Sequence, residues 1–368
     1  MEIDVSDLAP LSLGAAILGT GGGGDPYIGE LALRHLIEET APPLVIDLDE
    51  LADDALVVTV GTTGSPSVML EKLINRSFAD APLRRFERLI GRKADAILPV
   101  EIGGVNSLVP LMTSCVTGLP VLDADGMGRA FPTLDRTSFG IAGISAFPIV
   151  TMNERRETVI VEASSHARGE RIARGALVPM GASGSCAFYP MTGREAKQTT
   201  VGHTLSLALA LGRAVLSARV AKSSPFEAIL DVVARAGPGG YGRILFSGKI
   251  ADVSRETVGG YNIGSGVIVS SDERRSARFA FQNEFLFVRD EQRLLAVVPD
   301  LICFLDSETA QPVTCETLRY GQRVTVMGFA ATPHFRTPAG LAATGPRSFG
   351  LDEDYVPIER LTAAGPVG

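Results

Sequence analysis

The alternation of short apolar runs with helical segments constrains the fold of this chain most. Four runs of strand length, rich in aliphatic residues, occur in the first 125 residues: Leu44–Leu48, Ala55–Val60, Ala96–Val100 and Leu119–Asp123. Ser67–Gly91 and Asn106–Thr117 lie between them and have helical patterns. Strands that alternate with helices form parallel βαβ units with right-handed crossovers, and ligands bind at the carboxyl ends of the strands.

The pattern changes in the second half. The segment Gly202–Val220 is apolar nearly all round, which predicts a buried helix. Short strands between turns then follow: Arg243–Phe246, Gly266–Val269, Ala277–Phe281, Phe285–Val288, Leu294–Val298 and Arg323–Gly328. A length of 368 residues fits two domains. We therefore predict an α/β protein with an N-terminal parallel-sheet domain over residues 1–163 and a β-rich α+β domain over residues 164–368.

Charge and composition exclude several classes of partner. The net charge is −8, and no basic cluster is large enough to form the face that nucleic acid requires. No window has the 18 or so consecutive apolar residues of a membrane span, and the acidic N-terminus does not resemble a signal peptide. The four cysteines form no C-x-x-C pair. We expect a cytoplasmic protein with reduced thiols, a small-molecule substrate, and neither a nucleic acid nor a membrane as partner; a homo-oligomer is left open.

The strongest local motif is the glycine run that precedes the helix expected near Ile28. Five glycines before Asp25 allow backbone N–H groups to converge at a helix N-terminus, an arrangement that suits an anion or a developing oxyanion. Asp25 is expected to cap that helix, with Pro26 in its first turn. No G-K-[ST] follows, so this is not a Walker loop. The alternative is a flexible turn. The glycines assigned to substrate binding are Gly21, Gly22, Gly23 and Gly24.

Polar residues follow three predicted strands, and the carboxyl ends of neighbouring parallel strands lie side by side. Crowded carboxylates raise one another's pKa, which produces a general acid or base at neutral pH, although a cap or surface role is the alternative for each acid. The candidate catalytic residues are Asp25, Glu71, Asp123 and Asp125. The candidate binding residues from these loops are Lys72, Glu101, Asn106 and Arg129. No cofactor is assigned, and a divalent cation on the same carboxylates is left open.

Two further groups come from the second half of the chain. Gln282, Asn283 and Glu284 follow a predicted strand and are candidates for binding the amide edges of a ring substrate, with hairpin-turn chemistry as the alternative. Cys186 lies among small residues and is the best nucleophile candidate among the thiols, although a buried inert thiol is favoured. His203, at the start of the long helix, is favoured as structural, and no sequence-local zinc motif is present.

These motifs, taken in order, resemble those of the S-methyl-thiohydantoin desulfurase family. The similarity extends from about Gly19 to Pro357 and comprises GTGGGGDPYIG, the Glu71-Lys72 pair, EIGGVN, DADGMGRAFP, GGY, QNE, PDLI and LRYGQRV. The resemblance implies an N-terminal and a C-terminal domain, and hydrolytic removal of sulfur from C2 of a thiohydantoin ring to give a hydantoin. The chain departs from the family pattern at Val201-Gly202-His203-Thr204, where a Pro-Gly-Thr-like turn is expected.

Three hypotheses follow from the residues and the resemblance. The first is a hydrolase in which a carboxylate activates water, the glycine N–H groups hold the tetrahedral anion, and Lys72 or Arg129 binds an acidic tail. The second is a metal-dependent hydrolase that uses the same carboxylates. The third is a non-catalytic ligand-binding or accessory subunit of a hydantoinase system. All three require the glycine loop and the acidic loops to open into a common cavity.

Overall fold

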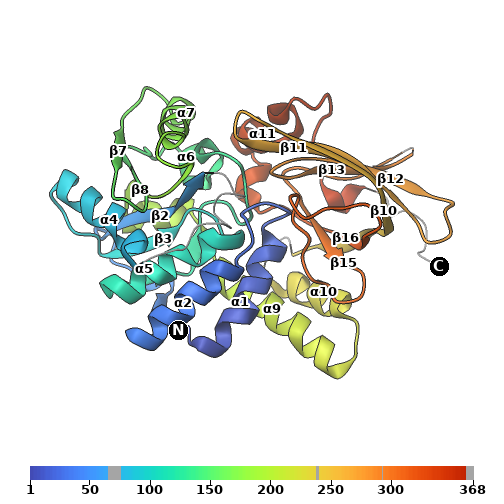
Figure 1. The fold of residues 1–368 in the computed structure, drawn as a ribbon, viewed down its shortest axis with the longest axis horizontal. Helices are drawn as coiled ribbons and strands as arrows, with labels where there is room; N and C mark the ends of the chain where they lie inside the picture. Colours follow the sequence, from blue (N-terminus) through green and yellow to red (C-terminus); the bar gives the residue numbers. More distant parts are fainter. Residues whose placement is uncertain (65–75, 238–239, 292, 362–368) are drawn as a thin grey trace.

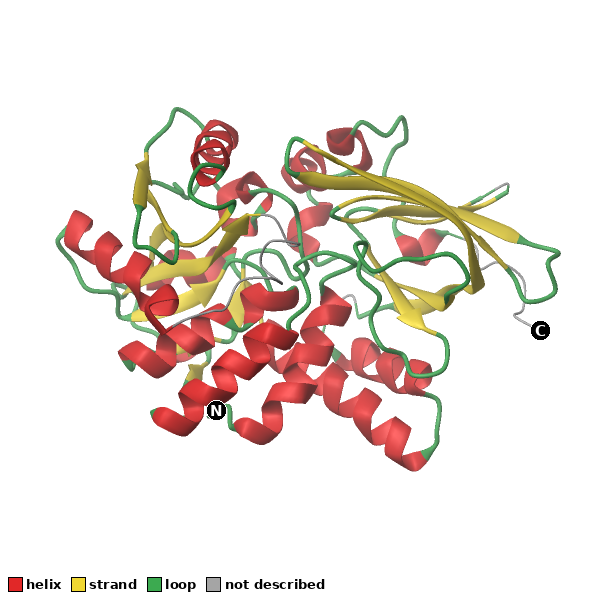
Figure 2. Ribbon diagram, viewed as in Figure 1, coloured by secondary structure: helices red, strands yellow, loops and turns green. Residues whose placement is uncertain are grey.

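The structure is a computed structural model that describes residues 1–64, 76–237, 240–291 and 293–361. Within this part, the chain forms two seven-stranded sheets, and helices cover the lower side of the molecule in the view of Figures 1 and 2. The first sheet lies on the left of Figure 1 and the second on the right. This mixed α/β architecture with a β-rich second part confirms the predicted fold class.

The first sheet has the spatial order β1-β4-β3-β2-β8-β6-β7. Its strands are β1 (Val45–Ile46), β2 (Leu56–Gly64), β3 (Ala96–Pro99), β4 (Val121–Leu122), β6 (Ile149–Met152), β7 (Thr158–Val161) and β8 (Ser183–Thr192). The first four in spatial order pair in parallel, as predicted. The other three pair antiparallel. Strands β6 and β8 were not predicted from the sequence, and β8 joins this sheet from beyond residue 163.

Helices cover the first sheet because alternate strand residues face two apolar cores. Val58 and Val60 pack toward α2 (Tyr27–Glu39), α4 (Arg76–Ile90) and α5 (Val109–Thr117). Val57 and Leu98 face the opposite core, near α6 (Ser138–Ile141) and α8 (Gly193–Thr199). The first residues of the helix expected over 67–91 lie outside the described part. The helix expected from Asn106 begins later, at Val109, because residues 104–107 form a 3-10 turn.

The second sheet is antiparallel throughout, with the order β14-β13-β12-β11-β10-β16-β15. Its strands are β10 (Gly242–Val258), β11 (Tyr261–Val269), β12 (Ser276–Gln282), β13 (Glu284–Asp290), β14 (Leu294–Val297), β15 (Leu301–Asp306) and β16 (Arg323–Phe329). A cluster of phenylalanines fills its core, in which Phe285 and Phe304 stack with ring centroids 3.9 Å apart. The sequence analysis missed β15.

Two helices pack backbone to backbone beneath the sheets. These are α1 (Val5–Leu18) and α9 (Thr204–Ala221), with α10 (Pro225–Arg235) alongside α9. A Cβ at Gly14 would lie 1.7 Å from the Ala208 carbonyl oxygen, and a Cβ at Gly212 would lie 1.7 Å from the Pro10 oxygen. The α9 helix is long and apolar enough to cross a membrane by composition alone. Only part of it is buried, which corrects the expectation of a helix buried all round.

The remaining elements lie between or after the strands of the two sheets. Helix α7 (His166–Leu177) leads from β7 to β8, and the short strands β5 (Ala124–Asp125) and β9 (Val201–Gly202) pair with each other. Helix α11 (Pro338–Thr344) follows the second sheet. All four cysteines are free.

Candidate active site

A cavity of about 140 Å³ is lined by residues from both halves of the chain. The glycine loop, the ends of β2 and β3, and the segment after β5 contribute one part of its wall. Further lining residues come from α2, α7, β6, β8, the turn before β13 and the segment after β15. The polar lining residues are Asp25, Thr62, Thr63, Glu101, Asn106, Thr133, Thr151, Glu154, Glu170, Arg174, Ser183, Asn283, Glu284 and Glu316. The expectation of a common cavity therefore holds for some of the predicted residues and not for others.

The glycine loop is fixed by its carbonyl groups. Thr20 O accepts from Phe285 N at 2.9 Å, and Gly21 O accepts from Cys315 N at 2.8 Å, so the second half of the chain holds the loop. The N–H groups of Gly23 and Gly24 donate to no acceptor in the described part of the chain. Both have positive φ, +74° and +75°, which favours glycine. The loop thus has two N–H groups without an acceptor among the described residues, and both belong to glycines that line the cavity.

The members of the glycine run differ in position. Gly22, Gly23 and Gly24 line the cavity, whereas Gly21 does not. Asp25 also lines it, but its Oδ1 accepts from Tyr27 N at 2.9 Å in an exposed position. The α2 helix begins at Tyr27, and Pro26 occupies the N-cap position that was expected for Asp25. Asp25 therefore precedes the N-cap by one residue. The structure therefore gives Asp25 a helix-capping bond.

Glu101 is a buried acid of the cavity wall, and each of its carboxyl oxygens accepts a hydrogen bond. It follows β3, is 6% exposed, and lines the wall. Its Oε1 accepts from Asn106 Nδ2 at 2.7 Å, and its Oε2 accepts from Phe131 N at 3.3 Å. Asn106 Oδ1 in turn accepts from the N–H and hydroxyl of Thr62 at 2.7 and 2.9 Å. Burial raises the pKa of Glu101 from 4.5 to about 8, against the lowering effect of the Asn106 hydrogen bond.

Glu284 is the second buried acid at this wall. It begins β13, is 4% exposed, and rests against the glycine loop: a Cβ at Gly22 would lie 2.0 Å from Glu284 Oε1. Its Oε2 has no hydrogen-bond partner among the described residues. Burial raises the pKa of Glu284 well above its ordinary value, the nearby Glu101 charge raises it further, and Arg129 opposes both.

Asp123 and Asp125, predicted as catalytic, do not line the cavity. Asp123 accepts from the N–H and hydroxyl of Ser206 at 3.0 and 2.5 Å, which ties it to the start of α9. Asp125 is fully buried and accepts from three backbone N–H groups, those of Ile102, Met127 and Gly128, at 2.8–3.0 Å. Burial raises its pKa to about 7 despite these donors. The structure gives both carboxylates bonds that hold loops together.

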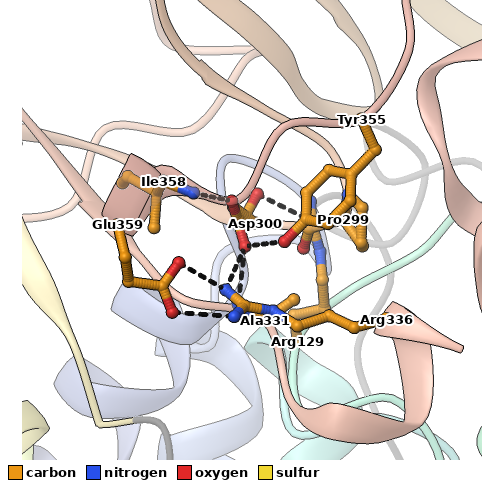
Figure 3. Close-up of polar contacts among 8 residues, drawn as sticks. All are labelled: Arg129, Pro299, Asp300, Ala331, Arg336, Tyr355, Ile358 and Glu359. Carbon is orange, nitrogen blue, oxygen red and sulfur yellow. Dashed lines mark hydrogen bonds and ion pairs between the residues drawn. The ribbon is translucent and has the colours of Figure 1, made fainter. Parts of the chain in front are cut away.

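Arg129 also lies behind the cavity wall and makes no ion pair with Asp123 or Asp125. Its guanidinium donates to Thr20 Oγ1 at 2.8 Å and to the carbonyl oxygens of Ala130, Pro299 and Asp300. Figure 3 shows Arg129 beside Pro299 and Asp300. Four of the five N–H groups of the guanidinium thus donate hydrogen bonds, two of them to the second half of the chain, and Arg129 is not among the residues that line the cavity.

Asp300 completes the junction in Figure 3. Its carboxylate is fully buried and accepts hydrogen bonds at 2.8–2.9 Å from Ala331 N, Arg336 Nη2, the Tyr355 hydroxyl and Ile358 N. Arg336 is also paired with Glu359 at 2.7 Å. A carboxylate with this many donors holds the C-terminal segment against the second sheet.

Of the remaining predicted residues, some line the cavity and others do not. Asn283 lines the cavity, whereas Gln282 does not. Asn283 has a φ of +63°; its N–H donates to Asn262 O at 2.8 Å, and its Oδ1 accepts from Asn262 N at 2.9 Å. These backbone contacts are typical of a residue in a turn between strands. Cys186 lines it, and burial raises the pKa of its thiol, so the thiol is not activated. His203 has an exposed side chain away from the cavity. Glu71 and Lys72 lie outside the described residues.

The sequence analysis missed the contribution of α7. Arg174 Nη2 pairs with Glu170 Oε1 at 2.5 Å, and both residues line the cavity. The Arg174 guanidinium also lies 4.9 Å from the centroid of the Tyr261 ring, at the tip of the β10–β11 hairpin. In sequence, α7 has the charge content of a solvated helix, and no local pattern shows that it faces a hairpin from the other half. Among the described residues, no group of three or more His, Cys, Asp or Glu could hold a metal ion.

The fold and cavity define a two-part α/β protein with a cavity that both parts of the chain line. The chain belongs to the S-Me-THD-like family: residues 6–163 match its N-terminal domain and residues 164–358 its C-terminal domain. The chain is also similar to a crystal structure of a protein from Chromobacterium violaceum, with 25% identity, a TM-score of 0.77, and coverage of 97% of this chain and 100% of that one. No curated protein matches the chain significantly.

Proposed function

We propose that this protein hydrolyses the carbon–sulfur bond at C2 of a thiohydantoin-type ring, releasing sulfur as a thiol or as sulfide and leaving a hydantoin. Membership of the S-Me-THD-like family supports a thiohydantoin-associated role. The cavity, with Glu101 and Glu284 buried in its wall, supports a small-molecule substrate. The observation that carries the proposal is the Glu101 carboxyl group, which is buried in the cavity wall and has a pKa near the physiological range.

Water must lose a proton as its oxygen attacks C2, and Glu101 is the group that accepts it. A pKa of about 8 leaves about a tenth of this carboxyl ionised at pH 7. The ionised fraction is a stronger base than an exposed glutamate because water does not solvate its charge. The Asn106 hydrogen bond, itself anchored by Thr62, fixes the direction of the carboxyl plane.

When the water oxygen attacks C2, negative charge develops on other atoms of the ring. The electron pair of the C2–N3 bond moves toward N3 and is shared with the C4 carbonyl oxygen. Donors at this edge of the ring lower the barrier if they are already oriented before the reaction. The free N–H groups of Gly23 and Gly24 are the donors that we assign to this role. The second step breaks C2–S, and the departing thiolate takes up a proton.

The test is product analysis in ¹⁸O-labelled water. The purified protein is incubated with an S-methylated thiohydantoin and, in parallel, with the unmethylated ring. Thiol and sulfide release are followed with a disulfide reagent, and the hydantoin is examined by mass spectrometry. Hydrolysis places one ¹⁸O at C2 of the product. Absence of thiol and sulfide from every ring tested would overturn the proposal and favour a non-catalytic ligand-binding or accessory role, which co-purification with a hydantoinase would then test.

A further inference from the structure

A second carboxyl group of the cavity has no role in the reaction as derived so far. Glu284 is 4% exposed, and one of its oxygens, Oε2, has no hydrogen-bond partner among the described residues. A buried polar atom without a partner is costly in a folded protein, and in a residue that lines a cavity it can be satisfied by a bound molecule. Its other oxygen contacts the glycine loop at Gly22. Glu284 thus lies beside the donors that we assign to the ring edge.

Burial favours the neutral form of Glu284 and raises its pKa; the charges of Glu101 and Glu316 act in the same direction, and those of Arg129 and Arg136 oppose them. Arg174 also lies within electrostatic range. Arg129 donates its hydrogen bonds to carbonyl and hydroxyl oxygens, so its charge is shared with other partners. Two acids that face one cavity do not ionise together, because the first charge opposes the second. Glu170, another acid at the wall, pairs with Arg174; burial raises the pKa of Glu170, and the Arg174 charge opposes that rise.

We propose that Glu284 is the general acid of this reaction and donates its proton to the ring nitrogen N3 while Glu101 accepts the proton of the attacking water. The inference rests on the proposed function. The water oxygen forms a bond to C2, and the electron pair of the C2–N3 double bond takes the proton from Glu284. The product of this step is a neutral tetrahedral intermediate that carries one hydroxyl group and the sulfur substituent on C2.

The same two carboxyl groups complete the reaction. The C2–S bond breaks, and its electron pair leaves with sulfur, which takes the proton held by Glu101. The hydroxyl proton returns to Glu284 as the C2 carbonyl forms. Both groups are then in their starting state. The sum is ring–S–R plus water giving hydantoin plus R–SH, without an oxidant or a reductant.

The environments of the two acids separate their titration, as general acid–base pairs require. Glu101 has a pKa of about 8 and ionises first; that charge then raises the pKa of Glu284. The active form, with Glu101 ionised and Glu284 neutral, therefore exists between the two ionisations. We expect kcat to rise with pH through about 8 and to fall again when Glu284 loses its proton.

The test compares kcat–pH profiles of the wild type and Glu284→Gln with the S-methylated ring. The amide keeps the size of the side chain but has no proton to give, so we expect kcat to fall about 10²–10⁴-fold. The fall in activity at high pH should disappear, while the rise near pH 8 remains. A merely structural role would lower kcat and leave both limbs in place. Glu87→Gln is the matched control, because Glu87 is a buried glutamate in α4, remote from the cavity lining.

Each outcome decides the inference. An active wild type with a Glu284→Gln variant that keeps the descending limb would overturn the role of Glu284 and leave the hydrolase proposal intact. A wild type that releases no thiol would overturn both. If Glu284→Gln does not fold, Glu284→Asp is the second variant. It retains an acid in altered surroundings, so the descending limb should persist at a shifted pH, and an unshifted limb would argue against the inference.

Discussion

Replacing the buried carboxyl of Glu101 with an amide should stabilise the protein while it removes activity. The pKa of Glu101 rises from 4.5 to about 8 on folding because burial disfavours the charged form. Between these pH values the unfolded chain releases the proton and the folded chain retains it, so stability falls as pH rises. The full loss is about 5 kcal/mol above pH 8, of which about 3 kcal/mol is reached at pH 7.

Glu101→Gln lacks this pH-dependent loss. The amide oxygen can still accept the hydrogen bond from Asn106, whereas the donor of Phe131 is left facing an amide NH₂, at a cost of about 1 kcal/mol. We therefore expect the variant to be more stable than the wild type by about 2 kcal/mol at pH 7, and about equally stable near pH 5. Loss of a general base should lower kcat by about 10²–10⁴-fold.

Urea denaturation at pH 5, 7 and 8, combined with thiol release from the S-methylated ring, measures both effects. Glu87→Gln is again the control: Glu87 accepts hydrogen bonds from Lys93 and from Ala94 N at 2.8 and 3.1 Å, so its loss should lower stability and leave kcat unchanged. The reasoning is refuted if Glu101→Gln retains more than a tenth of the wild-type kcat, or if its stability depends on pH between 5 and 8 as strongly as that of the wild type.

Three further substitutions test the packing that positions the site. Gly14→Ala should lower the free energy of unfolding by about 3 kcal/mol, because its Cβ would lie 1.7 Å from a backbone carbonyl oxygen of α9. Gly175→Ala is the control: open space surrounds this position in α7, so the substitution should raise the free energy of unfolding by about 0.5–1 kcal/mol. Urea denaturation of both variants measures these changes. Gly22→Ala should displace the carboxyl of Glu284 and lower kcat at least tenfold with little change in stability, and a kcat equal to that of the wild type would contradict the proposed contact. Asp125→Ala should cost about 3–6 kcal/mol, since three buried N–H groups lose their acceptor, and a loss of activity without a loss of stability in urea would instead indicate a catalytic role.

The acid residues show how far the sequence alone identifies the site. Glu101 and Asp125 both follow apolar strands, and nothing in the local pattern separates them. In the fold, three backbone N–H groups surround Asp125, while Glu101 faces the cavity. The difference arises from the direction in which each loop turns, and that direction depends on contacts with the rest of the chain.

The sequence by itself determined the parallel strands β1 to β4, the glycine loop before α2 and the β-rich second half, because periodicity and turn chemistry are local properties of the chain. Only the tertiary structure decided that β6 and β8 extend the first sheet antiparallel, that Arg129 joins the two halves, and that Glu284 meets Gly22 at the cavity. These features depend on which distant surfaces pack together. Packing is decided by the fit of whole side-chain layers, and such fit leaves no periodic pattern in a single sequence.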